Sequence, residues 1–180
     1  MSKFEDAINV ILVHEGGWVD NPADPGGETQ MGWSTSTIRK LGLTPRDLGL
    51  DQDEFTPGCL KAVTQATCIR LYRQYFWDKY HYQLLADQVV ATKIFDCSVN
   101  CGPGRAATMA QKAAAACGQQ IAVDGSLGPK SCAAVNSVPA QTFVHAMADQ
   151  MRSYYNGLVA ARPSLAVFKS NWLKRAAWGE

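Results

Sequence analysis

The sequence carries almost no excess of charge of either sign. Its 180 residues include 17 Lys and Arg against 16 Asp and Glu, a formal net charge of +1. A chain without a basic excess is poorly suited to neutralise a run of phosphates, so we expect no nucleic-acid partner. Apolar runs are also short, since the stretch Ile8–Val13 is far below the ~20 residues that a membrane-spanning helix needs. A hydrophobic content of 47% nevertheless indicates a folded globular protein.

The first residues do not predict a signal peptide, and the sequence shows no recognisable metal-binding motif. Two acids, Glu5 and Asp6, lie where a signal peptide would be basic, and no small-residue cleavage site follows, so we expect synthesis in the cytoplasm without a signal peptide. His14 and Glu15 begin the zinc-peptidase pattern His-Glu-x-x-His, but Trp18 occupies the position of the second His. The six cysteines contain no Cys-x-x-Cys pair, which favours buried thiols. We therefore predict no metal and no organic cofactor.

The sequence predicts a mainly helical, all-α fold. Ser2 and Glu5 have the spacing of a capping box, and Thr56-Pro57 is typical of a helix start. Residues 16–32 read as an ordered loop, long enough to be functional and compatible with a small β-ribbon. We expect two helical halves packed as one globule, in a monomer. Apolar residues at helical spacing predict helices over 2–14, 34–41, 57–77, 89–99, 104–117, 130–136, 139–162 and 165–173.

The loop carries a long motif that resembles glycoside hydrolase family 108. It reads His14-Glu15-Gly16-Gly17-Trp18-Val19-Asp20-Asn21-Pro22-Ala23-Asp24-Pro25-Gly26-Gly27-Glu28-Thr29-Gln30-Met31-Gly32. Members of this family are phage endolysins and prophage relatives with a lysozyme-like fold, which cleave peptidoglycan as N-acetylmuramidases. The resemblance implies host cell lysis, with access to the wall after another protein permeabilises the membrane.

The second half of the chain resembles the peptidoglycan-binding segment that accompanies this domain. The motifs are Phe95-Asp96, Val99-Asn100, Gly102-Pro103-Gly104-Arg105-Ala106, Val123-Asp124-Gly125, Gly128-Pro129 and Asn171-Trp172-Leu173-Lys174-Arg175. The resemblance implies a catalytic part over residues 1–94, a peptidoglycan-binding part over residues 95–180, and glycan strands as the partner.

Glycoside hydrolysis requires a proton for the leaving oxygen and a stabilised oxocarbenium-like centre. Glu15 follows an apolar helix face, where partial burial favours the protonated form, so we predict Glu15 as the general acid. Asp24 lies nine positions later, the interval that separates Glu from Asp in phage lysozymes, and Thr29 comes one position earlier than the Thr of those enzymes. We predict Asp24 as the second catalytic group, supported by Thr29. Asp20 remains an alternative for the same role.

Three residues are candidates for binding substrate. Trp18 either stacks on a sugar or pins the loop, Asp20 is a turn residue or a ligand, and Asn100 either bonds an N-acetyl group or caps its helix. Two other functions stay open: a lytic transglycosylase, which needs a single Glu, and a non-lytic peptidoglycan-binding or secretion-associated protein. The basic C-terminal helix offers only weak contact with a membrane.

Overall fold

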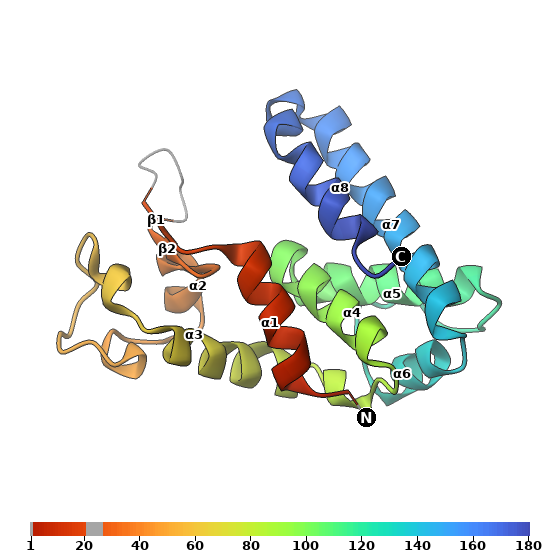
Figure 1. The fold of residues 1–180 in the computed structure, drawn as a ribbon, viewed down its shortest axis with the longest axis horizontal. Coiled ribbons are helices and arrows are strands. Elements are labelled where there is room, and N and C mark those ends of the chain that lie inside the picture. The colour runs from red at the N-terminus through yellow and green to blue at the C-terminus, as the bar shows by residue number, and fades with distance from the viewer. Residues whose placement is uncertain (1, 21–26) are drawn as a thin grey trace. The chain divides into compact units, whose positions relative to one another are not determined.

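The structure, a computed structural model, describes residues 2–20 and 27–180. Helices account for 66% of it, and the described residues form eight α-helices and one small antiparallel sheet (Figure 1), which confirms the mainly helical prediction. The α-helices are α1 (Phe4–Glu15), α2 (Thr35–Lys40), α3 (Gln65–Tyr72), α4 (Gln88–Cys101), α5 (Pro103–Ala116), α6 (Pro129–Asn136), α7 (Ala140–Ala161) and α8 (Lys169–Ala177). Short 3-10 segments lie at Arg46–Leu48, Cys59–Ala62, Tyr82–Leu84 and Pro163–Phe168, and a π-helical segment lies at Arg73–Asp78.

The chain divides into two compact units. One comprises Met1–Val10 together with Phe76–Glu180, and the other comprises Ile11–Tyr75. The functional division expected between residues 94 and 95 falls within α4 and stays a prediction, as does the packing of two halves into one globule.

The unit of residues 11–75 holds the sheet. Its strands are β1 (Trp18–Val19), β2 (Thr29–Gln30) and β3 (Trp33–Ser34), in the order β1-β2-β3 and antiparallel throughout. The β-ribbon expected in the loop is therefore present, with a third strand beyond it. Met31 and Gly32 connect β2 to β3, with φ angles of 46° and 82°. Positive φ at both central residues is what a two-residue type I′ hairpin requires.

The helix predicted over residues 57–77 is wrong in its first third. Gly58 has a left-handed φ of 82°, which stops a helix from starting at Pro57, and a 3-10 turn follows at Cys59–Ala62. The α-helix begins only after Thr64, whose hydroxyl accepts a hydrogen bond from the Thr67 backbone N–H at 3.2 Å.

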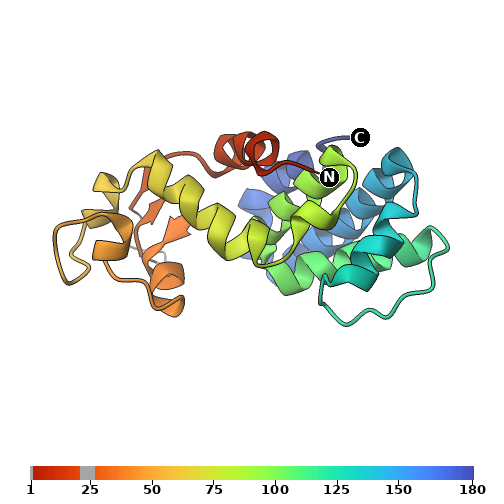
Figure 2. The same cartoon turned by 90° about the horizontal axis from the view of Figure 1, so that it is seen from below.

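The other unit is built around α4. Residues 90–98 of this helix are all buried, and both α5 and α7 pack against it (Figure 2). The alanines of α5 suit this position because their small side chains allow helices to approach closely. An aromatic cluster joins α1 to the rest of the unit: the Trp77 ring centroid lies 5.8 Å from that of Phe4 and 5.5 Å from that of Phe95.

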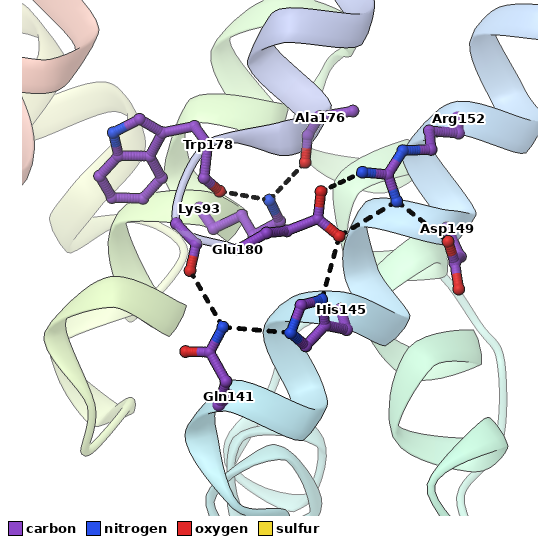
Figure 3. A network of polar contacts seen from close by, with 9 residues as sticks. Lys93, Gln141, His145, Asp149, Arg152, Ala176, Trp178 and Glu180 are labelled. Atoms are coloured by element: carbon purple, nitrogen blue, oxygen red, sulfur yellow. Dashed lines mark hydrogen bonds and ion pairs between the residues drawn. The ribbon is translucent and has the colours of Figure 1, made fainter.

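Polar contacts hold the last residues of the chain against α4 and α7. Lys93 is 1% exposed, and its ammonium donates hydrogen bonds of 2.6 Å to the carbonyl oxygens of Ala176 and Trp178 (Figure 3). The Glu180 carboxylate accepts hydrogen bonds from the Arg152 guanidinium. Burial lowers the pKa of Lys93 to about 8, because desolvation disfavours the charged ammonium.

A second polar network fixes the loop between α5 and α6. Gln111 is fully buried, and its side-chain amide donates to Asp124 Oδ1 at 2.7 Å and to Ser131 Oγ at 3.0 Å. Its carbonyl oxygen accepts a hydrogen bond from the Gly125 N–H at 2.9 Å. The hydrogen bond from Gln111 also lowers the pKa of Asp124.

Only part of the positive charge of α8 lies near the surface. Arg175 is 8% exposed and lies 3.4 Å from the Asp96 carboxylate, which leaves Lys169 and Lys174 as the cations of this helix nearer the surface. Recognition of anionic lipid typically uses a cluster of about four or more cations. In the described part of the chain, no helix has the length and apolar character of a membrane span.

All six cysteines are free thiols. Cys68, Cys97 and Cys132 are buried, and the other three are partly buried. The expectation of buried thiols is thus confirmed for three of the six.

Candidate functional site

Glu15 is the last residue of α1, and Gly16 ends the helix with a φ of 68°. The carboxyl group is half-buried and lies against the turn between β2 and β3. A Cβ placed on Gly32 would lie 2.7 Å from Glu15 Oε2 and 3.0 Å from Glu15 Cγ, and would overlap the Tyr72 hydroxyl. The bare backbone of Gly32 therefore makes room for both side chains.

Tyr72 fixes the other side of this arrangement. Its hydroxyl donates a 2.8 Å hydrogen bond to the carbonyl oxygen of Met31, and its ring centroid lies 5.0 Å from that of Trp33, which is 2% exposed. Met31 is one of two non-glycine residues with positive φ among the described residues. Because such strain persists only where surrounding contacts impose it, the bond from Tyr72 helps to hold the turn against Glu15.

Trp18 is anchored at its edge and open on part of its surface. Its indole N–H donates a 3.1 Å hydrogen bond to Glu28 Oε2, and the Lys61 ammonium lies 5.4 Å from the ring centroid. The side chain is still 36% exposed. The two roles considered for Trp18 are therefore compatible, because the loop is pinned through the indole edge while ring surface remains accessible.

Glu28 is a buried carboxylate that sequence reasoning missed. It is 7% exposed and also accepts a hydrogen bond from the Cys59 thiol at 3.4 Å. Burial raises the pKa of Cys59, and the neighbouring Glu28 adds to this shift, which keeps the thiol as a donor. The motif contained Glu28, but nothing in the sequence distinguishes a buried acid from an exposed one at this position.

The predicted site residues are distributed as follows. Thr29 is half-buried on β2, opposite Val19, and Asp20 is exposed just after β1. Glu15, Trp18 and Thr29 thus belong to one unit, with Trp18 and Thr29 on strands of the small sheet and Glu15 against the turn between β2 and β3. Asp24 lies outside the described residues.

Asn100 belongs to the other unit, near the end of α4. Its Oδ1 accepts a 2.9 Å hydrogen bond from the Tyr155 hydroxyl, so this side chain joins α4 to α7. Gly102 is the residue that caps α4. The substrate-binding role of Asn100 stays a prediction.

No group of three His, Cys, Asp or Glu within residues 2–20 and 27–180 is arranged to hold a metal ion. The chemistry available around Glu15 is that of a carboxyl group, a phenol and backbone amides.

Comparisons with known proteins bear on both parts of the chain. Residues 8–102 match the family model Glycosyl hydrolase 108, and residues 105–177 match a model described as a predicted peptidoglycan domain. Among solved structures, the chain is similar to SagA of Brucella abortus, with 27% identity and a TM-score of 0.75 over 97% of this chain and 89% of that one. No curated protein matches the chain. The chain therefore belongs to glycosyl hydrolase family 108 and combines a glycosyl hydrolase domain with a C-terminal peptidoglycan-binding domain.

Proposed function

We propose that this enzyme is a muramidase that hydrolyses the bond between N-acetylmuramic acid and N-acetylglucosamine in peptidoglycan, with Glu15 as the general acid. The observation that carries the proposal is the position of the Glu15 carboxyl group, half-buried at the end of α1 and packed against Gly32. A general acid must be held where it can reach the leaving oxygen, and the packing of Glu15 against Gly32 restricts where its carboxyl group can lie.

The remaining roles are proposed from the spacing of the motif. Asp24 is proposed as the second catalytic group, with Thr29 as its support and Asp20 as the rival for that role. Trp18, anchored by Glu28, is proposed as a platform for a sugar ring, because an exposed aromatic face packs well on the apolar face of a pyranose.

The test of the acid is Glu15→Gln, which keeps the shape of the side chain and removes its proton. We expect this variant to lose at least about 100-fold in the rate at which permeabilised cell walls clear, the lower end for general acid catalysis. Glu54→Gln is the matched control, since Glu54 is an exposed acid of the same unit. Equal clearing by Glu15→Gln and the wild type would contradict the assignment.

Asp24→Asn and Asp20→Asn, compared in the same assay, identify the second carboxylate. Mass spectrometry of the released fragments identifies the reaction. Reducing sugar ends are expected for hydrolysis, whereas anhydro ends would replace the muramidase proposal by a lytic transglycosylase. No fragments, together with retained binding to purified sacculi, would favour the non-lytic binding protein.

We further propose an endolysin-type role, in which the wall is reached through a membrane opened by another protein. Expressed in a bacterial cytoplasm, the wild-type chain should lyse cells only after the membrane is permeabilised with chloroform. Lysis without chloroform would contradict this part of the proposal.

A further inference from the structure

A basic groove lies between α5 and α7, with a volume of about 280 Å³. One wall is the face of α5 that carries Arg105, Thr108 and Lys112, and the other is the face of α7 that carries Gln150 and Tyr154. Spacings of three, four and seven residues place each set on one side of its helix. Every residue that lines the groove falls within the segment that matches the peptidoglycan domain, residues 105–177.

The charge of the groove is of one sign. Arg105 and Lys112 are both exposed, and no Asp or Glu is among its lining residues in the described part of the chain. The nearest acid in sequence, Asp149, is paired with Arg152 at 3.1 Å. In a chain whose net charge is only +1, two cations without an acid between them make a local site for anions.

The groove is also partly ordered before any ligand arrives. The Arg105 guanidinium lies 5.8 Å from the Tyr154 ring centroid and donates one hydrogen bond, of 3.2 Å, to the Cys101 carbonyl oxygen. A guanidinium has five N–H donors in a fixed plane, so further donors remain for a carboxylate. Met109, 5% exposed, supplies an apolar floor suited to aliphatic carbons.

These features match one part of peptidoglycan. In the polymer, the lactyl carboxyl group of each muramic acid is consumed by the amide bond to the stem peptide, so the free carboxylates belong to that peptide. The stem also offers amide groups for Gln150 and Thr108 and short aliphatic side chains for the floor. We propose that the groove between α5 and α7 binds the carboxylate-bearing stem peptide of peptidoglycan. This inference rests on peptidoglycan as the substrate, but not on Glu15 as the acid.

The test is a calorimetric titration of the full chain with the soluble monomer N-acetylglucosaminyl-N-acetylmuramyl-peptide. This monomer lacks the bond that a muramidase cuts, so binding is measured independently of catalysis. The double variant Arg105→Gln/Lys112→Gln should bind at least about tenfold more weakly, because charge-assisted hydrogen bonds to a carboxylate are lost. Lys130→Gln, which removes an exposed cation of α6 outside the groove, should bind like the wild type.

Two further ligands make the outcome decisive. The same monomer with its carboxylates amidated should lose about tenfold in affinity for the wild type and should no longer distinguish the double variant. Unchanged binding of the monomer by a double variant with an unchanged melting temperature would overturn the proposal. The proposal would also be overturned if the double variant kept its affinity for the monomer and lost only its binding of poly(glycerol phosphate). That result would assign the groove to a phosphate polymer of the wall.

Discussion

The contact between Gly32 and Glu15 predicts the effect of a single methyl group. Gly32→Ala places a Cβ 2.7 Å from Glu15 Oε2, on a residue whose φ is 82°. The left-handed backbone costs a non-glycine residue about 1–2 kcal/mol. Overlap with packed neighbours adds about 1–3 kcal/mol, so the free energy of unfolding should fall by roughly 2–5 kcal/mol. If the carboxyl group moves by about 1 Å to relieve the overlap, the rate of wall clearing should fall about 100-fold.

Gly42→Ala is the matched control for this substitution. Gly42 has a similar φ of 72° in the same unit, and a Cβ there meets no atom within 4 Å. The free energy of unfolding of the Gly42→Ala variant should fall by only about 1–2 kcal/mol, from the left-handed backbone conformation, and its activity should be unchanged. Urea unfolding measures the stabilities, and turbidity of permeabilised walls measures the activity. If the two alanine variants were equally stable and equally active, the reasoning about the contact between Gly32 and Glu15 would be refuted.

Three more predictions follow from buried polar groups. The unfolded chain keeps the Lys93 proton up to about pH 10.5, whereas the folded chain releases it near pH 8, so stability should rise with pH across this window. In urea unfolding at pH 7.5 and 10, Lys93→Met should show a smaller rise than the wild type, and an equal rise would exclude Lys93 as its source. Trp18→Phe should destabilise by about 1–3 kcal/mol, because the Glu28 carboxylate loses a donor. In the Glu28→Leu background, Trp18→Phe should destabilise the protein by less. An equal loss of stability in both backgrounds would contradict the interaction between Trp18 and Glu28. Gln111→Leu should cost roughly 1–3 kcal/mol and speed proteolysis between α5 and α6, because the buried Ser131 hydroxyl loses a donor and the loop loses its bonds to Asp124 and Gly125. Unchanged protection from proteolysis would argue against this role.

The parts of the fold that could be predicted are those fixed by neighbouring residues. The helices predicted over 34–41 and 130–136 are present: Ser34 caps α2 through a 3.1 Å bond from the Thr37 N–H, and α6 begins at Pro129. Ser2 shows where such local reasoning fails. Its hydroxyl donates to the Tyr82 carbonyl oxygen at 2.9 Å rather than capping α1, which begins at Phe4. A partner 80 residues away leaves no trace in the local pattern.

The same distinction applies to the candidate site. Glu15 could be selected because its motif is contiguous and its place after an apolar helix is visible in the sequence. Tyr72 could not, because only the folded chain brings α3 against the turn that contains Gly32. Glu28 was overlooked because its burial depends on Cys59 and the residues around it, which come from a later segment.

The discontinuous unit has a consequence for anyone who wishes to transfer its predicted peptidoglycan domain to another protein. The Phe4 ring belongs with Trp77 and Phe95, although long stretches of sequence separate them. A fragment cut at residue 105 would discard α4, whose residues 90–98 form the centre of this unit. A chimaera that keeps this unit intact must therefore include residues 1–10 and 76–104 as well. The boundary of the family match at residue 105 is therefore not the boundary of the folded unit.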